Sequence, residues 1–286
     1  APDWLLRAGR LGDTTYLMSD YRDVGYAYPW VRPPETAYTL LAVQHYDGVD
    51  LSYRIDAGEV GWRLRALAGR TDVTIPLSAG GTYRLATDDL AGFALVREEG
   101  PLHTWLGHST FSLAHDYMLP AAVRDGLRAL AGANLTGVDG EAADLLDMFD
   151  LAGTRIGYSA LGFRYDGADW FAQGEIGHLA APRKAFAQGT QAYLGIGYRA
   201  GNLMPFALLG SIRPARPALV PRSDWGDQAP LQSVLIGLAN SVRADQDLFT
   251  LGLRWDFASQ AAVKFQWSRM WMHADGWSLW FSDPAL

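Results

Sequence analysis

The stretch Leu248-Phe249-Thr250-Leu251-Gly252-Leu253-Arg254-Trp255-Asp256-Phe257 alternates apolar and polar residues. From Phe249 onward every odd-numbered residue is apolar, and every even-numbered residue from Thr250 to Asp256 is polar or glycine. Because successive side chains of a β-strand point to opposite faces, the pattern predicts a strand with one apolar and one polar face. The alternation resumes over 262–272 after a short break, which predicts a hairpin.

The same amphipathic unit recurs along the chain. Further strands are predicted over 4–11, 48–55, 60–69, 90–97, 102–111, 155–165, 170–179, 190–199, 203–212 and 276–281. Short turns alternate with longer links, which cover 12–47, 70–89, 112–154, 180–189 and 213–247. Short helices are predicted inside these links, over 119–130, 141–149 and 231–242.

This alternation of short and long connections is typical of an outer-membrane β-barrel, which has tight periplasmic turns and long extracellular loops. The sequence therefore predicts an all-β fold, an antiparallel up-and-down transmembrane β-barrel of about twelve strands. We expect residues 1–286 to form a single domain, with 12–47, 112–154 and 213–247 as long loops that contain the short helices.

A soluble barrel or sandwich is the alternative, since it alternates in the same way but hides its apolar face inside. Two observations favour the membrane. Aromatic residues such as Trp62, Tyr198 and Trp255 lie near strand ends on the apolar face, and only Lys184 and Lys264 are lysines among 24 basic residues. The expected location is the cell outer membrane, with the lipid bilayer and its lipopolysaccharide as partners.

Composition excludes several other classes. The 286 residues are 19% charged, carry a net charge of -7 and include no cysteine, so a basic nucleic-acid-binding surface, a disulfide scaffold and thiol catalysis are excluded. No run of about 18 apolar residues predicts a membrane helix. His108 and Ser109 are adjacent and should point to opposite faces, and no metal or phosphate motif occurs. We expect neither an enzyme nor a cofactor.

The polar strand faces should line water. The ionisable residues predicted to line a pore are Asp50, Arg54, Arg63, Arg65, Glu175, Arg199, Arg254, Asp256 and Lys264. Six of these nine are basic, which predicts a mild preference for anions or acidic small solutes. The alternative is that arginines and carboxylates on neighbouring strands form ion pairs whose role is only to maintain the shape of the barrel wall.

The link over 12–47 is the candidate constriction. Its aromatic and basic residues include Tyr21, Arg22, Tyr26, Tyr28, Trp30 and Arg32, and three prolines stiffen it. A link this long and aromatic should pack against something, either the inside of the pore, the mouth of the barrel or a neighbouring subunit.

A resemblance adds to these expectations. The stretches Arg7-Ala8-Gly9-Arg10-Leu11, Ser19-Asp20, Val24-Gly25-Tyr26-Ala27-Tyr28-Pro29-Trp30-Val31-Arg32-Pro33-Pro34 and Asp47-Gly48-Val49-Asp50 resemble Gram-negative porin-like proteins, which are similar to phosphate-selective porins and related diffusion channels. The resemblance implies an outer-membrane channel, often a homotrimer, whose long loop folds inward and narrows the pore.

The chain departs from that family at both ends. Such proteins carry further strands before the first of these segments and finish on a strand with a terminal aromatic, whereas this chain stops at Ser282-Asp283-Pro284-Ala285-Leu286. The expectation is therefore a shortened form. Two membrane functions remain: passive diffusion of small hydrophilic solutes, or a non-conducting barrel that is structural or binds a partner.

Overall fold

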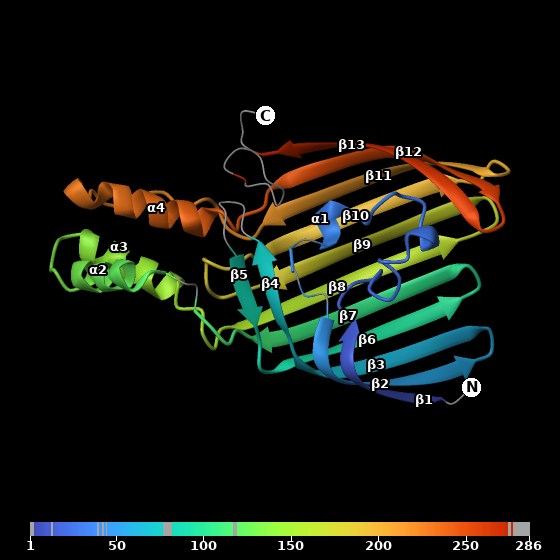
Figure 1. Cartoon of the computed structure of the whole chain (residues 1–286), viewed down its shortest axis with the longest axis horizontal. Helices are drawn as coiled ribbons and strands as arrows, with labels where there is room; N and C mark the ends of the chain where they lie inside the picture. Colours follow the sequence, from blue (N-terminus) through green and yellow to red (C-terminus); the bar gives the residue numbers. More distant parts are fainter. Residues whose placement is uncertain are drawn as a thin grey trace.

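Eleven strands form one antiparallel sheet in a computed structural model, which describes residues 3–276 except 13, 39, 42, 44, 77–81, 117–118 and 274–275. The order is β1-β2-β3-β6-β7-β8-β9-β10-β11-β12-β13, so each strand lies beside its predecessor in the sheet (Figure 1). The predicted up-and-down antiparallel arrangement is confirmed. The strand predicted over 276–281 lies outside the described residues, except for residue 276.

The observed strands match the predicted ones closely. They are β1 (Trp4–Gly12), β2 (His45–Ala57), β3 (Val60–Arg70), β6 (Leu90–Glu99), β7 (Leu102–Ser112), β8 (Arg155–Asp166), β9 (Trp170–Ala180), β10 (Gly189–Tyr198), β11 (Leu203–Pro214), β12 (Gln246–Ala258) and β13 (Ala261–Met272). The link over 70–89 holds a hairpin that the sequence did not predict, β4 (Asp72–Pro76) and β5 (Thr82–Ala86), which forms a separate two-stranded sheet.

The tight turns all lie at one end of the sheet and the long links at the other (Figure 1). We call these the turn end and the loop end. Three helices extend beyond the loop end as a cap, α2 (Ala121–Ala131), α3 (Val138–Met148) and α4 (Ala229–Asn240), close to their predicted positions. The cap has a hydrophobic core of its own, in which Leu127, Leu145 and Leu235 are buried.

The two faces of the sheet differ as the alternation predicts. On β12, Leu251 is 46% exposed while its neighbour Thr250 is 2% exposed. Register carries this difference across the strands, because Leu251 pairs with Trp267 of β13, which is 56% exposed. The apolar face is thus the outer face, and the polar face is the inner one. A soluble sandwich would bury the apolar face instead.

The sheet is curved, and its described part does not close. Among the described residues, β1 pairs only with β2 and β13 pairs only with β12. Each of these strands therefore keeps one edge without a strand partner in the part of the chain that is described. The expected barrel is present as its wall of consecutive strands, without the pairing that would close it.

Candidate functional site

A long segment lies against the inner face of the sheet. Residues 14–41, which we call the inner segment, include the short elements η1 (Gly25–Ala27) and α1 (Glu35–Tyr38) and cross the face over β8 to β10 (Figure 1). Met18 and Trp30 are among its buried side chains. The link over 12–47 was expected to pack inside the pore, over the mouth of the barrel or on a neighbouring subunit, and its described part lies on the inner face of the sheet.

Trp30 holds the middle of the inner segment. Its ring centroid lies 5.7 Å from that of Phe171 and 6.3 Å from that of Phe206. Gly195 of β10 makes room for the indole, because a Cβ at that position would lie 2.4 Å from Cζ3 of Trp30. The mid-strand glycine is therefore required by the aromatic residue that packs over it.

Polar contacts fix the inner segment near its start and near its end. The Oε2 atom of Glu175 on β9 accepts hydrogen bonds from the Leu17 backbone N–H at 3.0 Å and from the Tyr38 hydroxyl at 3.1 Å. Asp20 pairs with Arg65 of β3 at 3.1 Å. Two strands far apart in the sheet thus hold the same short stretch of chain.

Basic side chains of β12 and β13 also hold the middle of the segment. Arg254 donates to the carbonyl of Tyr26 at 2.9 Å, and its guanidinium carbon lies 4.4 Å from the centroid of that ring. Lys264 donates to the carbonyl of Trp30 at 3.0 Å and also contacts the carbonyls of Gly25 and Tyr28. Lys264 is thus committed to the segment's backbone, whereas Arg254 is shared between that backbone and Asp256, which lies 2.8 Å away.

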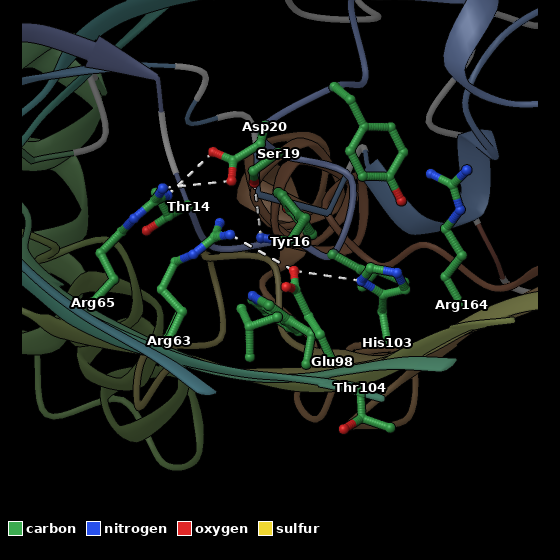
Figure 2. A pocket seen from close by; sticks show the side chains of 15 residues that line it. Thr14, Tyr16, Ser19, Asp20, Arg63, Arg65, Glu98, His103, Thr104 and Arg164 are labelled. Atoms are coloured by element: carbon green, nitrogen blue, oxygen red, sulfur yellow. Dashed lines mark hydrogen bonds and ion pairs between the residues drawn. The ribbon is translucent and has the colours of Figure 1, made fainter. Parts of the chain in front are cut away.

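A cavity of about 290 Å³ remains between the inner segment and strands β3, β6, β7 and β8; we call it cavity A. Figure 2 shows Arg63, Arg65 and Arg164 at its rim, with Glu98 and His103 facing one another across its floor. Glu98 lies 3.6 Å from Arg63 and 3.5 Å from His103. Thr104, the next residue after His103, points away from the cavity, as strand alternation requires.

A second cavity of about 340 Å³, cavity B, lies beyond the inner segment, toward β11 and β12. Arg164 lines both cavities, and Arg199, Arg254 and their carboxylate partners line only this one. Arg164 pairs with Asp166 at 2.6 Å, and Arg199 contacts the other oxygen of the same carboxylate. The two cavities thus share a wall at the turn end, with Arg164 between them.

Basic groups slightly outnumber acidic ones around this space. Five arginines and four carboxylates line the two cavities: Arg63, Arg65, Arg164, Arg199 and Arg254 against Asp20, Glu98, Asp166 and Asp256. Each arginine has a carboxylate within 4 Å, but Asp166 serves two of them. One positive charge is therefore left without a carboxylate of its own, and His103 adds a second when protonated.

Tyr21 of the inner segment lines cavity A as a neutral hydroxyl. Desolvation raises the pKa of its phenol to about 12. The hydroxyl therefore stays protonated at neutral pH and donates to Oε1 of Gln173 at 3.2 Å. The guanidinium of Arg164 lies 5.4 Å from the centroid of the same ring, so the aromatic face helps to position the shared arginine.

Some of the expected pore-lining residues lie elsewhere. Asp50 is fully buried beside Arg7, whose Nε donates to its Oδ1 at 2.9 Å, so it belongs to the wall. Glu175 is buried under the inner segment. Arg54 pairs with Asp56 at 2.9 Å and lines neither cavity.

The expected constriction residues also separate into two groups. Tyr21, Tyr26 and Tyr28 line the cavities, whereas Trp30 is buried beneath them. Arg22 lies 3.9 Å from Asp23 and Arg32 lies 3.0 Å from Glu35, so both pair with neighbours within the segment.

Sequence reasoning missed Asp20, Glu98, His103, Arg164 and Asp166. Arg164 and Asp166 alternate with Phe163 and Tyr165 and could have been found from the same pattern that identified the other strands. Glu98 and His103 lie beside a turn where alternation is weaker. Asp20 reaches Arg65 only through the fold of the inner segment, and no spacing in the sequence indicates that contact.

In the described ranges, no group of three or more His, Asp or Glu side chains could hold a metal ion. No described helix is both long and apolar enough to span a membrane. On the outer face, Nδ1 of His108 lies 2.8 Å from Oγ of Ser159 on the neighbouring strand, a pair that same-strand spacing did not reveal.

No protein-family model and no curated protein matches the chain. Among solved structures, Acinetobacter baumannii OccAB4 is 10% identical, with a TM-score of 0.43, over 93% of this chain and 56% of its own. The Pseudomonas putida toluene transporter TodX is 13% identical, with a TM-score of 0.31, over 81% of this chain and 70% of its own. OmpT, an outer membrane protein of Vibrio cholerae, is 15% identical, with a TM-score of 0.32, over 73% of this chain and 65% of its own.

The chain thus spans just over half the length of OccAB4. All three TM-scores lie below 0.5, so the assignment of the fold rests on the strand pairing and on the side chains that face outward.

Proposed function

We propose that this chain forms the wall of a porin-like channel in the outer membrane, for passive diffusion of small hydrophilic solutes. The exposed apolar outer face carries the proposal. Phe265 is 61% exposed and Leu209 is 59% exposed in the middle of their strands, where a soluble protein would place polar groups. Hydrocarbon is the solvent that such a face requires, and strands satisfy their backbone groups there only by pairing.

Aromatic side chains at the turn end support this placement. Trp4 stacks on Tyr53, with 4.2 Å between the ring centroids, and the ring centroids of Trp170 and Tyr198 lie 4.9 Å apart. Both pairs are on the outer face. Trp255, Phe257 and Tyr165 lie at the same end. Such residues gather at the boundary between hydrocarbon and headgroups, so the row marks one edge of the apolar band.

The route for solutes would run through cavities A and B, past Arg164. Both are lined by charged and hydroxyl groups on the inner face, and the inner segment narrows the space between them. The excess of one positive charge predicts a weak preference for anions, because charges that line a pore set its selectivity. The near-balance of arginines and carboxylates predicts that this preference is small.

A non-conducting barrel is the second candidate, and one observation favours it. The inner segment fills much of the inner face, with Trp30 and Met18 fully enclosed. If the two cavities do not join, the chain would be a plugged structural barrel whose cap binds a partner. Homotrimer assembly, which the resemblance to porins implies, stays a prediction that light scattering in detergent would test.

Ion current through a planar lipid bilayer separates the two candidates. The channel predicts discrete conductance steps, whereas a plugged barrel predicts none. In a salt gradient, the reversal potential of the wild type should indicate that anions permeate slightly better than cations. Asp166→Asn should increase the anion preference, because it removes a lining carboxylate, and Arg164→Gln should decrease it.

Arg10→Gln is the matched control for this measurement. Arg10 pairs with Asp47 at 2.8 Å, and Asp47 lies beside Val49 on the outward-facing series of β2, so the pair is outside both cavities. It should leave selectivity unchanged. A reversal potential that indicates cation selectivity in the wild type would refute the anion preference, but not the proposal that the chain is a channel.

A further inference from the structure

A groove on the outer face, near the loop end, lies between β7 and β10. It has a volume of about 420 Å³, and its polar lining is formed by His108, Thr110, Arg155, His178 and Gln188. Gly157 lies among them and leaves the groove open, since even a Cβ at that position would come no closer than 3.8 Å to His108. None of these residues belongs to the cavities on the inner face.

The polar groups around the groove are arranged in a row across four strands. His108, Ser159, His178 and Thr190 are register partners on β7, β8, β9 and β10 in turn. Nδ1 of His108 lies 2.8 Å from the Ser159 hydroxyl, and Nδ1 of His178 lies 2.9 Å from the Thr190 hydroxyl. When each hydroxyl donates to Nδ1, the imidazole proton resides on Nε2, so both rings present an N–H donor.

Arg155 adds the fixed positive charge. Its guanidinium contacts Asp89 at 2.5 Å and the Thr110 hydroxyl at 3.4 Å, while the side chain remains 58% exposed. A guanidinium has five N–H donors, so these two contacts leave donors for a ligand. Asp89 also accepts from the hydroxyl of Ser112 at 3.0 Å, and it is not among the residues that line the groove. The groove itself therefore offers mainly donors.

The position along the strands places the groove at an edge of the apolar band. On β9, the outward-facing residues on the turn side of His178 are Ile176, Ala172 and Trp170, with Gly174 between them. A strand tilted by about 40° rises roughly 20 Å between Trp170 and His178, close to the band height of about 25 Å. The aromatic turn end marks one boundary of the band, so the groove lies at the other.

We propose that this groove binds the phosphate of an anionic outer-leaflet lipid, which in a Gram-negative outer membrane is lipopolysaccharide. The inference rests on the proposed membrane location, because long loops mark the extracellular side. Arg155 supplies a charge-assisted hydrogen bond, and His108, His178 and Gln188 supply further donors. The row from His108 to Thr190 spans about 14 Å, three strand spacings, which is wide enough for a headgroup with more than one phosphate.

Native mass spectrometry of the detergent-solubilised chain tests the proposal. The probes are a diphosphorylated lipopolysaccharide of the rough type and the same lipid after enzymatic removal of its phosphates. The wild type should retain the phosphorylated lipid at least tenfold more tightly than the dephosphorylated one. Arg155→Gln should weaken that binding by about tenfold, since one charge-assisted hydrogen bond is lost.

Two further variants keep the result independent of folding. Arg155→Lys retains the charge and should restore most of the binding. The double variant His108→Leu and His178→Leu removes both ring donors but suits a lipid-facing position, and it should also bind about tenfold more weakly. Arg97→Gln is the matched control, because Arg97 pairs in register with Trp62 on the outer face at the turn end.

Flotation with phosphatidylcholine vesicles is measured in parallel. A wild-type chain that fails to float would refute the membrane location, and with it the groove as a lipid site. A chain that floats but retains both forms of the lipid equally would refute phosphate recognition alone. Equal loss of binding in Arg97→Gln and Arg155→Gln would also overturn the proposal, because it would reduce the effect to nonspecific charge.

Discussion

Replacing Trp30 with alanine should release the inner segment from the wall. The indole is 1% exposed and packs against Phe171, Tyr193 and Phe206, so its removal leaves a large void between the segment and strands β9 to β11. Truncations of this size cost about 3–5 kcal/mol. The polar anchors that remain, at Glu175, Arg254 and Lys264, hold the backbone but do not fill that space.

Trp30→Phe separates packing from polarity. Nε1 of the indole is buried without a hydrogen-bond partner among the described residues, so phenylalanine removes an unsatisfied donor while it keeps an aromatic ring in place. We expect this variant to lose less than about 1.5 kcal/mol, in the range of conservative aromatic and aliphatic exchanges. Trp267→Ala, on the exposed outer face, is the control and should leave the segment in place.

Limited proteolysis and bilayer conductance read out the effect together. In Trp30→Ala, cleavage within residues 14–41 should become faster, and single-channel current should rise and become noisier as the segment leaves the inner face. Trp30→Phe and Trp267→Ala should resemble the wild type in both assays. Unchanged proteolysis and current in Trp30→Ala would show that the aromatic cluster does not hold the segment, and would refute the reasoning.

Three further predictions concern other parts of the chain. Gly195→Val should mimic Trp30→Ala in the proteolysis assay, because even a Cβ would lie 2.4 Å from the indole; wild-type cleavage would contradict this. Leu251→Arg should lower the free energy of unfolding in lipid by about 2–4 kcal/mol, as measured by urea titration. An unchanged free energy of unfolding would argue against contact between that face and hydrocarbon. Burial alone would raise the pKa of Glu141, but hydrogen bonds from Ser223, Arg222 and Gln232 outweigh it and hold that pKa below its usual range. The carboxylate therefore stabilises the cap above its unfolded pKa, and this contribution is lost as the pH falls through the lower, folded value. Hydrogen exchange of α3 and α4 should accelerate as the pH falls through that range in the wild type but depend little on pH in Glu141→Gln.

The strands could be predicted from sequence because their signal is local. Alternation at a period of two residues identifies β12 within ten residues, without knowledge of its neighbours. The hairpin of β4 and β5 was missed because each strand has only five residues, so that its alternation of polar and apolar residues covers just four positions. Weak local patterns of this kind form strands only in the context of the surrounding fold.

The candidate site was harder to predict because its contacts join distant parts of the chain. Arg65 and Asp20 are 45 residues apart, and Lys264 and Gly25 are 239 residues apart. Strand alternation indicated that the inner face carries more basic than acidic residues, and it left open that arginines pair with carboxylates on neighbouring strands. It did not indicate which carboxylate each arginine would meet. The placement of Glu175 under the segment likewise depends on Leu17 and Tyr38, which no strand pattern connects.

The anchors of the inner segment have a mechanical consequence. Arg65 on β3, Glu175 on β9 and Lys264 on β13 all bind the stretch from Leu17 to Trp30, through the Asp20 side chain and the backbone of Leu17 and Trp30. This stretch therefore acts as a tie across the arc of the sheet. Cutting the tie would remove an obstruction and also let the arc relax to a larger radius. In the proposed channel, the width of the wall and the segment that narrows it would thus be set by the same contacts, and neither could be changed alone.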